Sequence, residues 1–187
     1  MAQPSGGQKK RAEESGVTLL YTPFAREAFV FIVNADNPVN SLTEQQVRDI
    51  FSGAITNWRT VGGNDQEIQT WQRPEDSGSQ TVMQSQVMKN VRMISPQETE
   101  VASMMEGMYY ATQMNADKNI KLLAINGIAP TAENIRNGKY PYIVDAFMVT
   151  RENTTSETQK LLEWFLTPQG QSLVEDVGYV PMYKTLP

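Results

Sequence analysis

The sequence predicts an α/β fold, because apolar segments with the spacing of strands alternate along the chain with segments that have the spacing of helices. Residues 28–33 are apolar on both faces, which is typical of a strand in the middle of a sheet. Residues 47–51 follow with apolar side chains at helical spacing, and residues 121–125 return to a strand pattern. The expected architecture is therefore a sheet covered by helices.

The first part of the chain contains two predicted strands and one predicted helix. Residues 17–21 and 28–33 favour strands, and Pro23 marks a break between them. Ser41 and Glu44 fit a capping box at the start of a helix. The buried face of this helix and the glycine that ends it are Val47, Ile50, Phe51 and Gly53.

The second part continues the alternation of elements. A stripe at helical spacing predicts a buried helix face rather than a metal site or an adaptable groove, and it comprises Val101, Met104, Met105, Met108 and Tyr109. Residues 121–125 and 140–150 predict strands. The next predicted helix carries Leu161, Leu162, Phe165 and Leu166. Thr167 is expected to cap a last helix, with Pro168 at its first position and Gly178 beyond its end.

The most informative stretch is residues 72–80, which lies between a predicted strand at 67–71 and a predicted helix at 81–89. It contains the groups that hold oxyanions in proteins, namely Arg73, Ser77, Gly78 and Ser79. The first N–H groups of a helix have no partner within it and carry the positive end of its dipole. An anion can therefore bind at such a turn, and a glycine lets the backbone approach it closely.

The same residues also have a purely structural interpretation. Ser77 and Gln80 fit a second capping box, which would bind nothing else. Arg73 could pair with Glu75 or Asp76 at the surface, an arrangement that contributes little to stability. Spacing alone favours this structural interpretation.

Composition limits the classes of function. The 187 residues carry a net charge of −5, which argues against a nucleic-acid partner. The sequence has no histidine and no cysteine, which excludes histidine-dependent triads, disulfides and thiol chemistry. No segment approaches the roughly 20 apolar residues of a membrane span, and residues 1–16 are polar, unlike a secretory signal. No cofactor is expected.

Several stretches resemble the phosphate-binding proteins of ABC transporters, in the periplasmic binding protein type 2 superfamily. The most specific is residues 49–58, which is similar to the family's Ile-Phe-Ser-Gly-x-Ile-Thr-Asn-Trp. Residues 72–80 resemble its Arg-x-x-x-Ser-Gly-Thr phosphate loop, with Ser79 in place of threonine. The other similar stretches are residues 37–43, 126–131, 166–171 and 178–181.

The resemblance implies that inorganic phosphate is the ligand and that an ABC-transporter permease is a partner, outside the cytoplasmic membrane. Carried over residue by residue, it implies that the phosphate ligands are Arg73, Ser77, Gly78 and Ser79. An arginine offers a planar, two-pronged contact that suits a phosphate. Glu75 is expected to hold the guanidinium rather than touch the anion, since a carboxylate beside a dianion is repulsive.

The resemblance also implies two lobes, with the chain crossing between them at residues 24–34 and 144–150. The expected organisation is a polar segment at 1–16, a partial first lobe from 17–34 with 139–187, and a second lobe at 35–138 that carries the anion loop. Family members have a further N-terminal half-lobe, with an acidic residue that accepts the phosphate's proton, and nothing here matches it. The passage from residue 93 to 110 is also shorter than in the family.

These departures leave three hypotheses. The preferred one is the C-terminal portion of a phosphate-binding transport receptor that is not an enzyme. The second is a shortened relative that binds a protein partner or another small anion. Whichever of these holds, the isolated chain is expected either to self-associate through the incomplete lobe or to bind phosphate only weakly. The third, an enzyme with Ser77 or Ser79 as nucleophile, lacks any base other than lysines and carboxylates.

Overall fold

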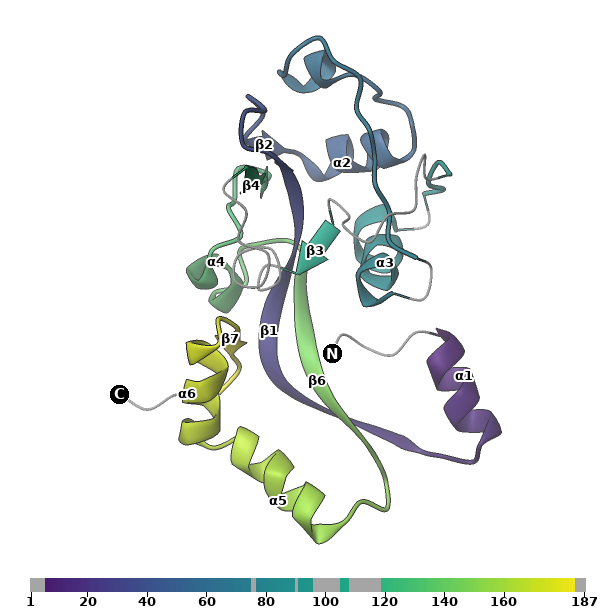
Figure 1. Ribbon diagram of the computed structural model, residues 1–187, viewed down its shortest axis with the longest axis vertical. Helices are drawn as coiled ribbons and strands as arrows, with labels where there is room; N and C mark the ends of the chain where they lie inside the picture. The colour runs from purple at the N-terminus through teal and green to yellow at the C-terminus, as the bar shows by residue number, and fades with distance from the viewer. Residues whose placement is uncertain (1–5, 75–76, 90, 96–104, 108–118, 184–187) are drawn as a thin grey trace.

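The computed structural model describes residues 6–74, 77–89, 91–95, 105–107 and 119–183 of the chain. Strands and helices alternate as expected for an α/β protein (Figure 1). In chain order the elements are α1 (Gly6–Glu14), β1 (Leu19–Asn34), β2 (Ser41–Leu42), α2 (Glu44–Phe51), η1 (Trp58–Val61), α3 (Gly78–Val82), η2 (Met83–Met88), β3 (Met105–Gly107), β4 (Ile120–Leu122), β5 (Ala124–Ile125), α4 (Ala132–Arg136), β6 (Ile143–Arg151), α5 (Ser156–Phe165), α6 (Pro168–Asp176) and β7 (Val180–Pro181).

One strand, β1, organises the whole molecule. It pairs antiparallel with β6 along residues 19–28, with β7 at 25–26, with β3 at 29–31 and with β4 at 32–34. The predicted break at Pro23 is wrong, because residues 19–21 and 28–33 belong to this single strand. Pro23 instead sits at an irregularity in the β6 register between residues 23 and 25, where a missing N–H is tolerated.

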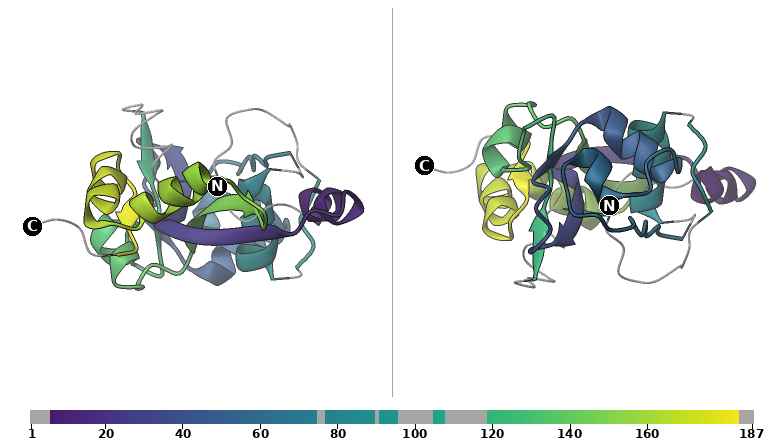
Figure 2. Two further views of the ribbon diagram at one scale, coloured as in Figure 1. Left: turned by 90° about the horizontal axis from the view of Figure 1, so that it is seen from below. Right: turned by 90° about the horizontal axis from the view of Figure 1, so that it is seen from above.

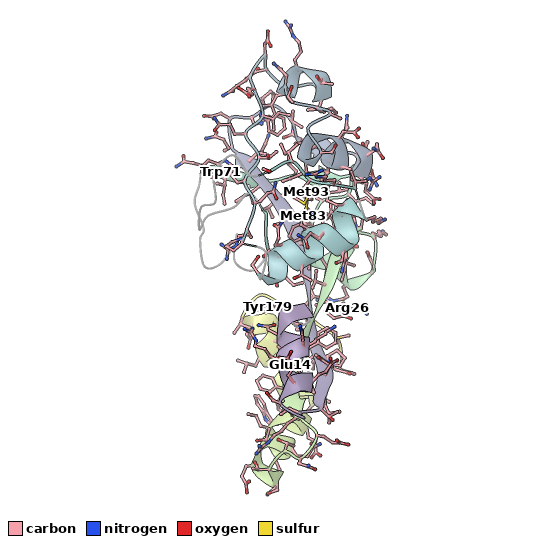
Figure 3. All side chains as sticks on the ribbon, turned by 90° about the vertical axis from the view of Figure 1, so that its right-hand side faces the viewer. Glu14, Arg26, Trp71, Met83, Met93 and Tyr179 are labelled. Atoms are coloured by element: carbon pink, nitrogen blue, oxygen red, sulfur yellow. The ribbon has the colours of Figure 1, made fainter. Side chains whose placement is uncertain are left out.

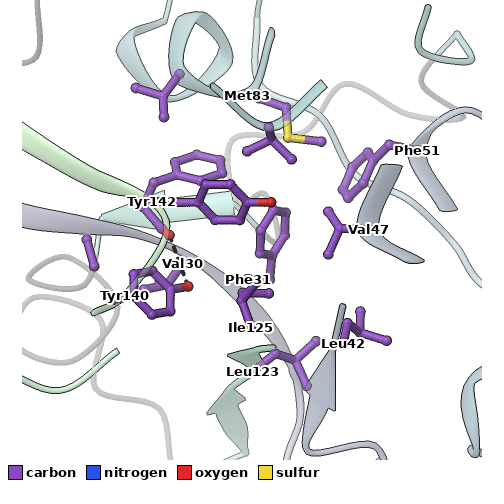
Figure 4. Close-up of a cluster of buried hydrophobic side chains, with 14 of the residues drawn as sticks. Val30, Phe31, Leu42, Val47, Phe51, Met83, Leu123, Ile125, Tyr140 and Tyr142 are labelled. Atoms are coloured by element: carbon purple, nitrogen blue, oxygen red, sulfur yellow. Dashed lines mark hydrogen bonds between the residues drawn. The ribbon is translucent and has the colours of Figure 1, made fainter. Parts of the chain in front are cut away.

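The larger lobe is built around the second half of β1. Ala28 to Phe31 are at most 3% exposed, as expected of a strand that is apolar on both faces. The side chains that pack around it come from α2, η2, β5 and the segment before β6 (Figure 4). The labelled ones are Val47, Phe51, Met83, Ile125, Tyr140 and Tyr142, with Leu42 and Leu123 beside them.

Helix α2 confirms the predicted buried face of Val47, Ile50 and Phe51, and Gly53 follows its end with a φ of 83°. The predicted Ser41–Glu44 capping box is wrong. Ser41 lies in β2, and the cap is Thr43, whose hydroxyl accepts from the Gln46 N–H at 3.0 Å while the Gln46 side chain accepts from the Thr43 N–H at 2.8 Å. The pairs Ser41–Glu44 and Thr43–Gln46 both have the three-residue spacing of a capping box, but Ser41 already belongs to strand β2.

The smaller lobe contains the first half of β1, most of β6, and helices α5 and α6. Among the described residues its apolar core is small, with Ala25, Ala146 and Val174 buried together and three partly buried aromatic residues packed around them. Gln171 ties its parts together, since its amide donates to the Phe24 and Phe165 carbonyl oxygens at 2.9 and 2.8 Å. Its carbonyl oxygen accepts from the N–H groups of Met182 and Tyr183, each at 2.9 Å.

Helix α6 agrees with the sequence-based prediction, whereas the strands at 120–125 and helix α1 differ from it. The predicted cap at Thr167, the start at Pro168 and the position of Gly178 are confirmed for α6. The single strand predicted at 121–125 is two short strands, because residues 120–122 pair with β1 while 124–125 pair with β2. Helix α1, on the side of the molecule opposite α4 and α6 (Figure 2), was not predicted and buries no residue.

The predicted methionine stripe falls mostly outside the described residues. Of its members only Met105 is described, and it lies in strand β3, so the helical prediction is wrong there. None of the helices that the structure describes is long and apolar enough to cross a membrane.

Candidate functional site

The predicted anion loop ends at a helix N-terminus, as the sequence indicated. Ser77 has the extended backbone of a cap residue, and its hydroxyl oxygen accepts from the Gln80 N–H at 3.1 Å. Helix α3 starts at Gly78 and continues directly into the π-helical turn η2. The predicted strand before the loop is wrong, because in residues 67–71 only an isolated bridge between Glu67 and Asn57 is formed.

The predicted reciprocal capping box at this helix is half correct. Ser77 caps α3, but the Gln80 side chain does not return to the Ser77 N–H, which donates instead to the Pro74 carbonyl oxygen at 2.9 Å. Gln80 is turned inward and is 4% exposed. Its amide donates to the Gln72 side-chain oxygen at 3.4 Å, and Gln72 donates to the Ile94 carbonyl oxygen at 2.8 Å.

These two glutamines hold both ends of the loop, a role that the sequence analysis missed. Gln72 precedes Arg73 and Gln80 follows Ser79, so their contact fixes where the loop begins and ends. Met93 packs near the Gln80 amide, and Figure 3 shows Met83 and Met93 on this side of the molecule above Arg26. In the sequence, the contact between Gln72 and Gln80 is indicated only by the fact that two glutamines flank a polar loop.

A cavity of about 270 Å³ lies between this helix and strand β6. Its helix wall includes Gly78, Thr81 and Ser85, and its strand wall includes Asp145 and Phe147. Gly78 is exposed and has no side chain, so the backbone of the first helical turn faces the cavity. Among the described residues, Arg73, Ser77 and Ser79 do not line it, and they are half-buried in the adjoining turn. Glu75 lies outside the described residues.

The hydroxyls in and beside the cavity differ in whether their proton is already used in a hydrogen bond within the protein. Thr81 donates its hydroxyl proton to the Ser77 carbonyl oxygen at 3.1 Å, and Ser85 donates to the Thr81 carbonyl oxygen at 2.7 Å. The Ser77 hydroxyl acts as an acceptor in its cap, so its proton remains for another acceptor. The Ser77 hydroxyl is therefore able to donate to an anion at the start of α3, which the Thr81 and Ser85 hydroxyls are not.

The strand wall adds one ion pair. Asp145 accepts from the Arg26 guanidinium at 3.4 Å, and both side chains are a little over one third exposed. Such a pair contributes little to stability. Its effect on the cavity is electrostatic, because Arg26 offsets a negative charge that would otherwise oppose an anion.

A second cavity does not suit an anion. It measures about 590 Å³ and lies beyond the end of β1, where amides surround Trp58 together with Asp36 and Glu67. No lysine or arginine lines it among the described residues. The described part of the chain also contains no group of acidic side chains that could hold a metal ion.

The protein thus has an α/β fold of two unequal lobes, which share the strands β1 and β6. The chain belongs to the PBP superfamily, since a family model described as a PBP superfamily domain matches residues 4–169. The fold is thus of the periplasmic binding protein type 2 kind, with one nearly whole lobe and one partial lobe.

Known relatives are longer than this chain. It is 26% identical over 160 residues to the phosphate-binding protein PstS of Bacillus subtilis, covering 80% of this chain and 53% of that protein. It is 24% identical over 181 residues to PstS of Borreliella burgdorferi, covering 85% of this chain and 64% of that protein. The chain therefore spans about half to two thirds of the length of these relatives.

Solved structures share the fold. A Clostridium perfringens protein with bound phosphate superposes with a TM-score of 0.80 at 23% identity, covering 97% of this chain and 77% of that one. An ABC-type phosphate transport receptor from Vibrio cholerae superposes with a TM-score of 0.68 at 24% identity, covering 87% of this chain and 72% of that one.

Proposed function

We propose that this chain binds an oxyanion, inorganic phosphate in particular, at the N-terminus of α3. The observation that carries the proposal is the opening of the first turn of α3, at Gly78, into the cavity against β6. Helix N-termini bind phosphate through unpartnered N–H groups and the helix dipole. The names of the PstS relatives give the ligand class.

The proposed ligands are Arg73, Ser77, Gly78 and Ser79. Arg73 supplies the charge and a two-pronged contact, and the free proton of the Ser77 hydroxyl adds a donor. Gly78 supplies its main-chain N–H without a side chain in the way. We propose that Glu75 orients the arginine.

The wider role follows from the relatives. We propose that the chain is a solute-binding protein, or its C-terminal portion, that delivers phosphate to an ABC-transporter permease outside the cytoplasmic membrane. The proposed lobe boundaries are 17–34 with 139–187 for the smaller lobe and 35–138 for the larger. Binding of another small anion or of a protein partner is the alternative.

Calorimetric titration with phosphate tests the ligand, with sulfate and plain buffer as comparisons. Arg73→Ala should weaken phosphate binding by about 1.5 to 3 kcal/mol, roughly 10- to 150-fold, the range for a hydrogen bond to a charged group. The matched control is Arg59→Ala, which removes an exposed ion pair with Asp65 at 3.3 Å in the larger lobe. Equal affinities for the two variants would reject the site.

The proposed chemistry is binding without turnover. Ser77→Ala should weaken anion binding but change no hydrolytic rate, because the chain contains no histidine or cysteine to activate a nucleophile. Hydrolysis of a chromogenic phosphate ester that disappears in this variant would contradict the proposal.

A further inference from the structure

The second cavity has the volume of a small-molecule site, about 590 Å³, and has no role in the proposed function. Its walls come from the end of β1, the start of η1, the start of β4 and residues 64–69. Among the described residues, none lines both this cavity and the one beside α3. The two cavities are therefore separate sites on the larger lobe.

Trp58 gives the second cavity a large aromatic wall that the backbone holds in place. Its N–H donates to the Gln66 carbonyl oxygen at 2.9 Å, and its carbonyl oxygen accepts from the Gly63 N–H at 2.8 Å. A side chain at position 63 would meet the Trp58 Cβ at 2.8 Å, so the loop closes on Trp58 only because this residue is a glycine. The indole is half-buried, packs against the core of the larger lobe and lines the cavity. The aromatic surface is thus in position before a ligand arrives.

Two carboxylates line the same cavity without a cation beside them. Asp36 and Glu67 are exposed and form no ion pair within the described part of the chain. Asp65 differs from them, because it lies outside the cavity, pairs with Arg59 at 3.3 Å and accepts from the Asn57 amide at 3.0 Å. The unpaired negative charge of this region is therefore concentrated in the cavity.

The lysine next to the cavity wall is held by neutral groups. Lys121 follows the lining residue Ile120 and donates to the Asn37 carbonyl oxygen and to the Asn40 side-chain oxygen, the latter at 2.7 Å. Neither lysine nor arginine lines the cavity in the residues that the structure describes. Side-chain amides, which both donate and accept, complete the walls, and they belong to Asn34, Asn37, Asn64, Gln66 and Gln69.

We propose that the second cavity binds a small organic cation, with an alkylammonium group against the Trp58 ring and its charge balanced by Asp36 and Glu67. Tryptophan attracts cations more strongly than the other aromatic side chains do. Two carboxylates without partners repel an anion and remain unpaired beside a neutral solute. A metal ion fits less well, because the described residues contain no group of acidic side chains that could hold one.

The probe is choline, whose matched control is dimethylbutanol, its isostere with a neutral carbon in place of the charged nitrogen. NMR titrations of the full chain follow the indole N–H signals of the three tryptophans, and the Trp58 signal is identified by its loss in Trp58→Leu. We expect choline to shift the Trp58 signal in a saturable manner and to leave that of Trp164, in α5, unchanged. Dimethylbutanol should bind at least tenfold more weakly, since it lacks the charge that the ring and the carboxylates attract.

Substitutions at exposed carboxylates test the site without disturbing the core. Asp36→Asn and Glu67→Gln should each weaken choline binding about fivefold, the effect of one unit charge about 4 Å away in water. Asp65→Asn is the matched control, because it makes the same change of net charge in the same lobe at a carboxylate outside the cavity. It should leave the affinity unchanged. Circular dichroism checks that the variants fold.

Three results would overturn the proposal. Equal affinities for choline and dimethylbutanol would show that the cavity selects for shape and not for charge. Equal losses in Asp65→Asn and Asp36→Asn would show that only the overall charge matters. Choline binding that leaves the Trp58 signal in place would put the cation elsewhere.

The test is independent of the proposed phosphate site. Phosphate should leave the affinity for choline unchanged, because no described residue lines both cavities. A chain that binds choline at Trp58 and does not bind phosphate would support the cation site and reject the proposed function. A chain that binds phosphate and not choline would reject the cation site alone.

Discussion

Replacing Ser77 by aspartate separates the two roles that its hydroxyl has in this structure. As the cap of α3, the hydroxyl oxygen accepts from the Gln80 N–H at 3.1 Å, and an aspartate oxygen can accept the same bond. As a proposed phosphate ligand, the hydroxyl donates its proton, which an ionised aspartate lacks. The variant should therefore keep the stability of the protein and lose the anion.

The size of the loss follows from two contributions. Removing one hydrogen bond to a charged group costs about 1.5 to 3 kcal/mol. A carboxylate about 4 Å from a unit negative charge, at an effective dielectric constant of about 20, adds roughly 4 kcal/mol of repulsion. Together they lower the affinity by more than a thousandfold. Ser77→Ala, in contrast, should cost about 1 kcal/mol of stability through the lost cap and only the first of these contributions in affinity.

Calorimetry with phosphate and urea unfolding measure the two quantities on the same samples. Thr155→Asp is the control, since Thr155 caps α5 by accepting from the Thr158 N–H at 3.3 Å and gives the same change of net charge. It should keep both stability and affinity. Undiminished phosphate binding in Ser77→Asp would show that the anion does not lie at the start of α3.

Three further changes test the packing inside the two lobes. Tyr140→Phe should lower the free energy of unfolding by about 1 kcal/mol, because the Tyr140 hydroxyl donates to the Phe29 carbonyl oxygen. Tyr142→Phe should not lower it, since the buried Tyr142 hydroxyl has no partner in the described part of the chain. Urea unfolding compares the two variants. Burial raises the pKa of both hydroxyls above the usual value of about 10. The contribution of each protonated hydroxyl to the free energy of unfolding is therefore complete below that pH, and above it each contribution falls by about 1.4 kcal/mol per pH unit. An unfolding series at alkaline pH that is equally steep in the double phenylalanine variant would contradict this. Gln171→Leu should cost more than about 3 kcal/mol in thermal or urea unfolding, because four main-chain groups lose their partner, and a loss below 1 kcal/mol would be inconsistent with that network.

Local patterns predicted the α/β class and some of the helix ends, because caps and amphipathic spacing act over a few residues. The cap at Thr167 and the buried face of α2 are of this kind. What the sequence could not reveal was pairing at long range. Pro23 indicates a break in isolation, but β6 and β7 hold the chain extended on both sides of it.

The candidate site was predictable in part for the same reason. Ser77 and Gly78 follow from helix-start chemistry, and the structure confirms the helix start there. The wall formed by Asp145 and Phe147 lies more than 60 residues away in sequence, so no local pattern could place it. The inward turn of Gln80 also depends on Gln72 and Ile94, which the capping pattern does not include.

The central position of β1 has a consequence for how the chain is made. β1 ends at Asn34, yet its longest partner β6 begins at Ile143 and β7 at Val180. At about 5 to 20 residues per second, synthesis of the intervening stretch to β6 takes roughly 5 to 20 seconds. Throughout that interval an apolar strand has emerged without its main partner, and pairing of such distant segments is intrinsically slow. Nascent chains should therefore depend on a holding chaperone until β6 has emerged, and premature release would favour aggregation through β1.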